Sequence, residues 1–339
     1  MMFRDYLRQI VEGRNLDQEQ MGGMIDEILS GNVTDAQVGA FMAALAIKGE
    51  TFEELAGAAR AMRRKAQRIQ VTAPVVVDTC GTGGDGLATF NISTTTAFVV
   101  AGAGVTVAKH GNRAVSSKSG SADVLESLGV NLSTPPEIVE EAVAEIGIGF
   151  LFAPLYHSAM RHAGRARQEV GLRSIFNMLG PLTNPAGANC QLLGVYAPQL
   201  TEMFAEALKL LGTRRALVVH GHDGLDEISV CAATRVSEIS DGRVHTYDIQ
   251  PEHYFGRLAD PAELTGGDPQ QNADITRAVI GGQDGPCRDV VLINAAAALM
   301  AAGRADDLTS GIEQAKLAID SGAATEKLQA LVDFTTSQV

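Results

Sequence analysis

The sequence predicts an α/β protein in which a small all-helical N-terminal domain precedes a larger domain with a mostly parallel central sheet. Residues 1–72 carry apolar side chains at helical spacing only, whereas residues 73–339 alternate short β-branched runs with helical stretches. Such alternation is typical of parallel sheets whose strands are joined by helices. We expect two domains with these bounds, and we expect part of residues 160–190 to pack on the helical domain.

In the helical domain, apolar residues recur at helical spacing over residues 3–11 and again over residues 21–29. Two capping boxes, TDAQ from Thr34 and TFEE from Thr51, predict where two further helices begin. The stretch DAQVGAFMAALAIKG (35–49) is apolar on more than one face, which indicates packing on two sides. We therefore expect this domain to form the interface of a homodimer.

In the second domain, the segments VVVD, VTVAKHG and ALVVHG are predicted to be strands, and AVIGG (278–282) is predicted to be a shorter strand-like piece. Helices are expected at STTTAFVVAGAG and SADVLESLG. Ligands of parallel sheets bind beyond the carboxyl ends of the strands, where the loops gather. The loops after the first three strands should therefore converge on one site.

The first of these loops, in VVVDTCGTGGDG (75–86), matches the G-x-G-x-x-G pattern of dinucleotide-binding proteins. Three observations oppose a dinucleotide. LATFN separates the glycines from the next helix, Lys109 stands where an acidic residue should hold the ribose, and Asp85 repels phosphates unless a metal lies between them. Leu87 stands where a P-loop needs its lysine. A tight turn without a ligand stays open as the alternative.

Two segments after the glycine loop indicate an anion site. Asn91, Ser93 and Thr94 begin the next helix, where a hydroxyl can cap the helix and free N–H groups can hold an anion. The segment KHGNRAVSSKSGS (109–121) then combines cationic side chains with serines, and its glycines allow close approach of the backbone. Simple capping and a solvated basic loop are the alternatives.

Two acidic residues lie after the strand ALVVHG, in the loop HDGLDEIS. Magnesium is usually held by one or two carboxylates together with substrate phosphates and water. Asp226 and Glu227 could supply these carboxylates if the loop faces a polyphosphate, and otherwise they form part of a surface loop.

Three arginines lie in a helical stretch before the turn-rich LGPLTNP. An arginine can hold a carboxylate through two parallel hydrogen bonds, which would suit a second, carboxylate-bearing substrate. Residue chemistry alone does not choose among Arg161, Arg165 and Arg167.

Composition excludes several classes of protein. A net charge of −13 opposes nucleic-acid binding, which depends on cationic contacts to phosphate. No apolar run approaches the roughly 18 residues of a membrane span, and the N-terminus lacks a signal-peptide core. Four widely spaced cysteines suggest neither a disulfide framework nor a zinc site. We expect a cytoplasmic protein that binds neither nucleic acid nor membrane.

Four motifs in this order carry a family resemblance: GTGGDG…TFNIST, KHGNR…GSADVLESLG, FLFAPLYHSAMRHAGRARQEVGLRSIFNMLGPLTNP and DGLDE. Together they resemble the anthranilate phosphoribosyltransferases, over nearly the whole chain. The resemblance implies a fold like that of the nucleoside phosphorylases. It also implies transfer of the phosphoribosyl group of 5-phosphoribosyl 1-diphosphate (PRPP) to the amine of anthranilate, with release of diphosphate, in tryptophan biosynthesis. Residues 73–339 would then form the PRPP-binding catalytic domain.

The resemblance also implies a role for individual residues. Contacts with PRPP would come from Gly81, Gly84, Asp85, Thr89, Asn91, Ile92, Ser93, Thr94, Lys109, His110, Gly111, Asn112, Arg113, Ala114, Val115, Ser116, Ser117 and Ser121. Contacts with anthranilate would come from Gly81, Asn112 and Arg167, with Arg167 on the carboxylate. Two magnesium ions are implied, with Ser93 as a ligand of one and with Asp226 and Glu227 holding the second. Ser158 departs from the proline expected in the family, near the presumed anthranilate channel.

The chemistry implied by the resemblance needs no assigned general base. Loss of diphosphate leaves positive charge on the sugar and negative charge on the leaving group, which magnesium and the cationic loop would stabilise. The aromatic amine of anthranilate is already neutral at pH 7, so orientation against the sugar can suffice. His110 is expected to contact phosphate rather than to act as a base. Three other interpretations are a pyrimidine nucleoside phosphorylase, a non-catalytic homologue that binds nucleic acid, and an NAD-dependent oxidoreductase.

Overall fold

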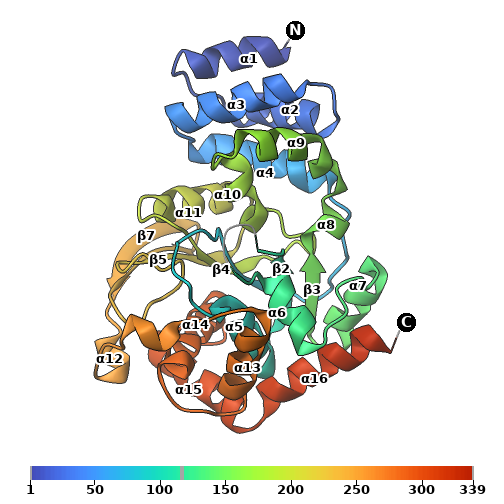
Figure 1. Cartoon of the computed structure of the whole chain (residues 1–339). Helices are drawn as coiled ribbons and strands as arrows, with labels where there is room; N and C mark the ends of the chain where they lie inside the picture. Colours follow the sequence, from blue (N-terminus) through green and yellow to red (C-terminus); the bar gives the residue numbers. More distant parts are fainter. Residues whose placement is uncertain (1, 115–117, 338–339) are drawn as a thin grey trace.

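The computed structural model describes residues 2–114 and 118–337, with a helical part at one end and an α/β part at the other (Figure 1). The N-terminal helices are α1 (Met2–Val11), α2 (Gln18–Leu29), α3 (Asp35–Lys48) and α4 (Phe52–Lys65). The Thr34 and Thr51 side chains accept hydrogen bonds from the backbone N–H groups of Gln37 and Glu54. Both predicted capping boxes are therefore confirmed.

Two helices from the middle of the chain pack on this helical part. They are α9 (Arg161–Val170), which contacts α2 and α3, and α10 (Ile175–Leu179), which contacts α3 and α4. The Phe41 ring of α3 meets the Phe176 ring of α10 edge-on, with 6.4 Å between the ring centroids. The connection that contains α9 and α10 therefore brings part of the central chain next to the N-terminal helices.

The α/β part contains a seven-stranded sheet within the described residues, with the order β3-β2-β1-β4-β5-β6-β7. The strands are β1 (Val76–Gly81), β2 (Thr106–Gly111), β3 (Ile148–Phe152), β4 (Cys190–Gly194), β5 (Arg215–Gly221), β6 (Thr234–Ser240) and β7 (Arg243–Ile249). Strands β1 to β5 pair in parallel, whereas β6 and β7 are added antiparallel. The prediction of an α/β fold with a mostly parallel sheet is confirmed.

The strand order changes direction between β1 and β4. The chain proceeds from β1 through β2 to β3 on one side of β1, and then returns to β4 on the other side. At such a point the loops after the two adjacent strands leave on opposite faces and open a crevice in which ligands bind. The topology therefore predicts a ligand-binding crevice at the carboxyl ends of β1 and β4.

Helices and short helical turns cover both faces of the sheet (Figure 1). The remaining elements are α5 (Ile92–Gly102), α6 (Ser121–Leu128), α7 (Pro136–Glu145), α8 (Ala153–Tyr156), η1 (Ser158–Met160), η2 (Gly180–Leu182), α11 (Leu200–Leu210), α12 (Glu252–Phe255), η3 (Pro261–Leu264), α13 (Pro269–Ile280), α14 (Pro286–Ala301), α15 (Leu308–Asp320) and α16 (Ala323–Thr336). None of the helices in the described part is long and apolar enough to cross a bilayer.

Neighbouring strand residues enter different cores because side chains alternate between the two faces of a sheet. Leu192 and Leu217 belong to a core that contains residues of α5 and α14. Leu193 and Val218 belong to a second core, which continues through α11 into the N-terminal helices. The helical part therefore shares its hydrophobic core with one face of the sheet.

The prediction of a strand-like piece at residues 278–282 is wrong. Residues 278–280 form the last turn of α13, which begins at an Asp268–Gln271 capping box with Pro269 in its first turn. Val279 and Ile280 are buried. A short apolar run at the end of an amphipathic helix has the same composition as a buried strand, so it does not distinguish the two.

A buried ion pair fixes the turns between the N-terminal helices. One carboxylate oxygen of Glu54 accepts from Leu16 N–H at 2.9 Å, and the other lies 2.9 Å from both Lys48 Nζ and Thr51 N–H. Both ionic side chains are nearly inaccessible to solvent. Because the Lys48 ammonium group and the Glu54 carboxylate are buried together, removing one of them leaves the other as an unpaired buried charge.

We therefore expect Glu54→Ala to lower the free energy of unfolding by about 3 kcal/mol, the low end of the loss measured when a buried ion pair is broken. Urea unfolding followed by circular dichroism measures the change. Lys316→Ala removes a lysine from a largely exposed pair with Glu313 and should change stability little. Equal stability losses in the two variants would contradict the assignment.

Candidate active site

The glycine loop after β1 and the acidic loop after β5 meet at the crevice between β1 and β4. The Gly83 N–H donates a hydrogen bond to Asp226 Oδ2 at 2.9 Å. A Cβ atom on Gly81 would lie 2.7 Å from that Oδ2, and one on Gly194 would lie 1.5 Å from the Asp226 carbonyl oxygen. Only glycine, which has no side chain, allows Asp226 to come this close to Gly81 and Gly194. The glycine loop and the acidic loop therefore converge, as the sequence predicts.

Three carboxylates gather beside the glycine loop. Burial, and next the charge of Asp85, raises the pKa of Asp226 to about 7. Burial, followed by the charge of Asp226, holds the pKa of Glu227 well above its usual value, and burial also raises the pKa of Asp85. Carboxylate oxygens with accumulated negative charge fit a hard divalent cation such as magnesium. Among the described residues, no three His, Cys, Asp or Glu side chains form a metal site by themselves.

Lys109, near the end of β2, is a buried cation that acts electrostatically on Glu227. Its ammonium group donates to the Thr79 carbonyl oxygen and lies 3.3 Å from Ser93 Oγ. Burial lowers the pKa of Lys109, while the charges of Asp78 and Glu227 oppose this shift. Lys109 therefore brings positive charge next to the first turn of α5.

The first turn of α5 is contacted by the acidic loop, since the Ser93 backbone N–H donates a hydrogen bond to the Glu227 carboxylate. The cap residue Asn91 makes no side-chain hydrogen bond to the helix. Its side chain instead donates to the Ser119 carbonyl oxygen at 3.2 Å and accepts from Asn272 at 2.9 Å. The Ile92 N–H donates to the Phe90 carbonyl oxygen at 2.8 Å, and Thr94 is buried, so Thr94 could contact an anion through its backbone N–H rather than through its side chain.

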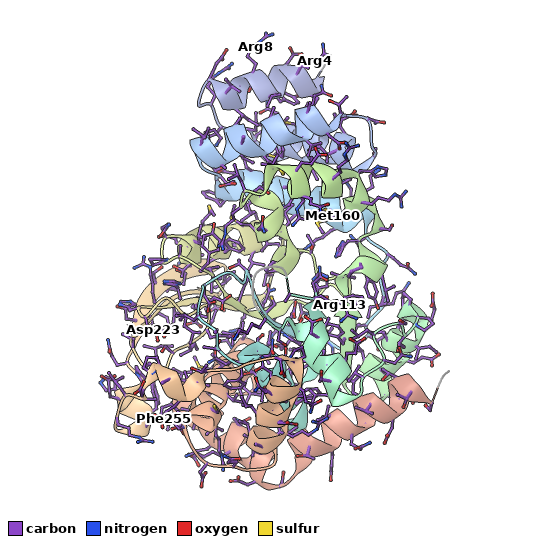
Figure 2. All side chains as sticks on the ribbon, in the orientation of Figure 1. Arg4, Arg8, Arg113, Met160, Asp223 and Phe255 are labelled. Atoms are coloured by element: carbon purple, nitrogen blue, oxygen red, sulfur yellow. The ribbon has the colours of Figure 1, made fainter. Side chains whose placement is uncertain are left out.

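Side chains of α6 hold residues at both ends of the loop between β2 and α6. Asp123 accepts hydrogen bonds from the backbone N–H groups of Ala114 and Gly120, each at 2.9 Å. The Arg113 guanidinium, beside α6 in Figure 2, pairs with Asp123 at 2.9 Å and with Glu126 at 2.8 Å. Arg113 therefore has carboxylate partners within the chain, and its charge is largely neutralised.

The other loop positions expected to bind PRPP have these places. Asn112 Oδ1 accepts from Arg113 N–H at 2.8 Å, and the Asn112 carbonyl oxygen accepts from Ser121 Oγ at 3.3 Å. A Cβ on Gly111 would lie 2.1 Å from Ser121 Oγ. Thr89 pairs with Thr265, which holds the far end of the glycine loop. The expected contacts at Val115, Ser116 and Ser117 lie outside the described residues.

Two buried histidines lie where the middle of the chain crosses β2. His110 Nδ1 is 3.2 Å from the Gly180 carbonyl oxygen, and the His110 and His157 ring centroids are 5.1 Å apart. Burial, and then the charge of His157, lowers the pKa of His110 to about 3. Burial lowers the pKa of His157 to about 4, against a weaker contact with the Thr183 backbone. Both rings are therefore neutral at pH 7, and His110 is poorly suited to accept a proton there.

The three arginines of α9 differ in their surroundings. Arg165 is largely exposed and pairs with Glu169 at 2.8 Å, and Arg161 is exposed at the start of the helix. Arg167 is half-buried over the Phe176 ring, 5.7 Å from its centroid, and burial lowers its pKa. No carboxylate in the described part of the chain lies within ion-pair distance of Arg167. Of the three, Arg167 is best suited to bind a substrate carboxylate.

Two residues at the site were not selected from the sequence. His157 stands beside His110, and Arg173 donates a hydrogen bond to the Gly84 carbonyl oxygen at 2.9 Å. Both belong to the long segment that carries the family resemblance, so the signal was present there. Neither has a local pattern, such as a glycine motif or paired carboxylates, that separates it from its neighbours.

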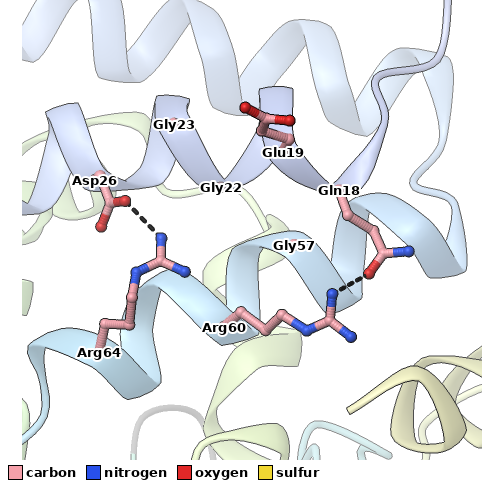
Figure 3. A pocket seen from close by; sticks show the side chains of 8 residues that line it. All are labelled: Gln18, Glu19, Gly22, Gly23, Asp26, Gly57, Arg60 and Arg64. Atoms are coloured by element: carbon pink, nitrogen blue, oxygen red, sulfur yellow. Dashed lines mark hydrogen bonds and ion pairs between the residues drawn. The ribbon is translucent and has the colours of Figure 1, made fainter.

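A hollow of about 490 Å³ between α2 and α4 is separate from this site (Figure 3). Arg64 pairs there with Asp26 at 2.5 Å, and Arg60 donates to the Gln18 side chain. No residue expected to bind a substrate or metal lines it. The hollow therefore does not form part of the candidate active site.

Comparison with known proteins agrees with the fold and the motifs. A family model described as "Glycosyl transferase family, a/b domain" matches residues 73–325, and one described as "Glycosyl transferase family, helical bundle domain" matches residues 4–66. Anthranilate phosphoribosyltransferases from Syntrophobacter fumaroxidans and Desulfosudis oleivorans are 69% and 68% identical to the chain, across 98% and 99% of it and 99% of each relative. The chain belongs to the anthranilate phosphoribosyltransferase family.

Solved structures of anthranilate phosphoribosyltransferases have the same fold. The enzyme from Thermus thermophilus has a TM-score of 0.92 at 42% identity, covering 97% of this chain and 99% of that one. The enzyme from Saccharomyces cerevisiae in complex with PRPP and Mg has a TM-score of 0.91 at 29% identity, covering 99% and 98%. The predicted anthranilate phosphoribosyltransferase resemblance is thus confirmed over the length of the chain.

Acidification should destabilise this family member through His110 and His157. The pKa values of both rings in the folded protein lie below the ordinary value near 6.5. At a pH between the folded and the ordinary values, the unfolded chain therefore binds more protons than the folded chain. The neutral rings make their full contribution to the free energy of unfolding above about pH 6.5, and this contribution is lost as the pH falls towards about 4. Each ring contributes up to about 1.4 kcal/mol per pH unit in that window. Urea unfolding of His157→Leu at several pH values should show a shallower dependence than the parent protein.

Leu317→Ala provides the control, since Leu317 is exposed and its side chain does not titrate. This substitution should leave the slope between about pH 6 and about pH 4.5 close to that of the parent protein. If His157→Leu also leaves that slope unchanged, the buried ring is not the source of acid sensitivity.

Proposed function

We propose that the chain transfers the phosphoribosyl group of PRPP to the amine of anthranilate, giving N-(5-phosphoribosyl)anthranilate and diphosphate in tryptophan biosynthesis. The observation that carries the proposal is the meeting of the glycine loop, Lys109 and the Asp226–Glu227 pair at the crevice of the sheet. This arrangement occurs in a chain that is 69% identical to a relative named for that activity. The Saccharomyces cerevisiae relative was solved with PRPP and Mg bound, and also with 4-fluoroanthranilate.

PRPP would lie over the crevice, with its diphosphate against the glycine loop and the first turn of α5. The N-terminal end of α5 and the ammonium group of Lys109 can stabilise negative charge on the departing diphosphate. Lys109 to Ser117 and Ser121 would contact the 5-phosphate and the diphosphate, with little contribution from the Arg113 guanidinium, because its charge is already paired with Asp123 and Glu126.

Two magnesium ions would be held beside this position. Ser93 would bind one, and Asp226 and Glu227 would bind the other, with diphosphate oxygens completing the coordination. Magnesium, when bound, supplies positive charge that offsets the charge of the diphosphate. The raised pKa values of the carboxylates fit this role, because a cation would relieve their mutual repulsion.

Anthranilate would approach from the side of α9, with its carboxylate on Arg167 and further contacts to Gly81 and Asn112. An unpaired, half-buried guanidinium binds a carboxylate more strongly than an exposed one, since less water competes. The chain then has to orient a neutral aromatic amine against the sugar carbon, and no side chain needs to remove a proton beforehand.

The proposed reaction can be tested through the fluorescence of anthranilate. The protein is mixed with anthranilate, PRPP and magnesium, and each component is omitted in turn. Loss of fluorescence that requires all of them supports the transferase. No loss with folded protein would contradict it. Phosphate-dependent cleavage of a pyrimidine nucleoside would instead identify a phosphorylase.

Arg167→Gln should raise the KM for anthranilate by about tenfold to a hundredfold, because a charge-assisted bidentate contact is lost. The KM for PRPP should stay within about twofold, since Arg167 is not assigned to that substrate. Arg165→Gln removes a neighbouring charge that already has a partner in Glu169 and should leave both constants unchanged. Similar KM changes for both substrates in Arg167→Gln would show that the residue is not a specific carboxylate ligand.

We further propose that the protein acts in the cytoplasm as a homodimer formed through the helical domain, residues 1–72. The Ile47 side chain at the end of α3 is 88% exposed and Val11 at the end of α1 is 69% exposed. Large apolar side chains left in water on neighbouring helices fit a surface that a second copy of the chain covers.

Ile47→Glu should shift the protein from dimer to monomer, because a charge placed in an apolar interface is desolvated without a partner. Light scattering coupled to gel filtration measures the mass. Leu317→Glu is the matched control, since Leu317 on α15 is also exposed but lies outside the helical domain. A monomeric parent protein, or a dimer unaffected by Ile47→Glu, would contradict this interface.

A further inference from the structure

Arg173 links the helical part to the glycine loop. It lies between α9 and α10, two residues after Gly171, whose φ of 64° ends α9. Its Nη2 donates a hydrogen bond to the Gly84 carbonyl oxygen at 2.9 Å, and its Cζ lies 3.8 Å from the centroid of the Tyr196 ring. Tyr196 follows β4, so the guanidinium touches the loops after β1 and β4 on both sides of the crevice.

The loop that Arg173 contacts contains several glycines, whose backbones can adopt many conformations. Gly83, Gly84 and Gly86 all have positive φ values, of 65°, 79° and 78°. Such glycines lose much backbone entropy when they are held in one conformation. The start of the loop is held by the Thr82 N–H bond to Gly194 and by the Gly83 N–H bond to Asp226, each at 2.9 Å.

At Gly84 the loop is restrained by a side chain from another segment, that of Arg173. Among the described residues, Arg173 is the one side chain of the segment carrying α9 and α10 that makes a hydrogen bond to residues 81–87. A Cβ on Gly84 would lie 2.1 Å from Arg173 Nη2, so the contact requires a glycine there. Stacking on Tyr196 fixes the plane of the guanidinium and therefore the direction of its N–H groups.

We propose that Arg173 is a positioning residue that holds the glycine loop in the conformation that binds the diphosphate of PRPP. This role rests on the proposed transferase function. Arg173 acts through the loop and does not itself touch the substrate. Without it, residues 84–87 sample more conformations, and PRPP has to order them on binding.

The first test measures the loop without any substrate. Hydrogen–deuterium exchange is followed in a peptide covering residues 81–87 of the free protein, for the parent protein, Arg173→Met and Arg173→Lys. Methionine keeps an apolar stem against Tyr196 but has no donor, whereas lysine can still donate to Gly84. Exchange should be faster in Arg173→Met and intermediate in Arg173→Lys. Unchanged exchange in Arg173→Met would overturn the proposal whether or not the protein is a transferase.

The second test measures turnover of the same variants. Arg173→Met should raise the KM for PRPP about tenfold, as expected for losing one hydrogen bond from a charged donor, with the KM for anthranilate and kcat within about twofold. Arg173→Lys should recover part of the loss. Arg165→Met removes the same charge from the preceding helix and should match the parent protein in both tests.

The outcomes separate the two proposals. A parent protein without turnover refutes the transferase, and the exchange measurement alone then decides whether Arg173 holds the loop. A parent protein with turnover, combined with equal rises of both KM values and a lower melting temperature in Arg173→Met, assigns Arg173 a general structural role and overturns the proposal. An unchanged KM for PRPP overturns it as well.

Discussion

The architecture of the site depends on how closely Asp226 approaches the ends of β1 and β4. Its carboxylate reaches the backbone of Gly83, and its carbonyl oxygen packs where Gly194 would carry a side chain. This contact joins the loop after β5 to the loop after β1, across the strand that lies between them. The negative charge of the acidic pair is thereby placed against the glycine loop, and the cationic end of β2 and the first turn of α5 complete the same surface.

A buried polar network beneath the site holds the strand ends in register with the middle of the chain. Asp78 accepts from the His110 backbone N–H at 3.1 Å and from the Asn184 side chain at 2.8 Å. Asn184 also donates to the Ala108 carbonyl oxygen at 2.7 Å, and the Gln191 side chain donates to the Pro181 carbonyl oxygen at 2.6 Å. Burial raises the pKa of Asp78, and the charge of Lys109 is the largest effect that opposes this shift. These bonds connect β1, β2 and β4 to η2 and the residues that follow it, next to the Gly180 carbonyl oxygen that contacts His110.

Local signals in the sequence were sufficient for part of this structure. The capping boxes at Thr34 and Thr51 involve residues three apart, so they predict helix starts without knowledge of the tertiary fold. The parallel order of strands also implied that the glycine and acidic loops would meet. The partners of Arg113 were not predictable in this way, because Asp123 and Glu126 lie ten and thirteen residues later and meet it only in the folded structure. Arg173 was missed for a related reason: its hydrogen-bond partner, Gly84, lies almost ninety residues earlier in the chain.

The shared core of the helical part and the sheet limits how the molecule can move. Leu193 and Val218 on the sheet pack in one continuous cluster with residues of the N-terminal helices and α11. A wide rigid-body hinge between the two parts would expose these side chains to water, at about 25 cal/mol for each Å² of apolar surface. Any separation of the helical part from the sheet therefore carries a free-energy cost set by the apolar area that it exposes, so the N-terminal helices act as part of the support of the sheet.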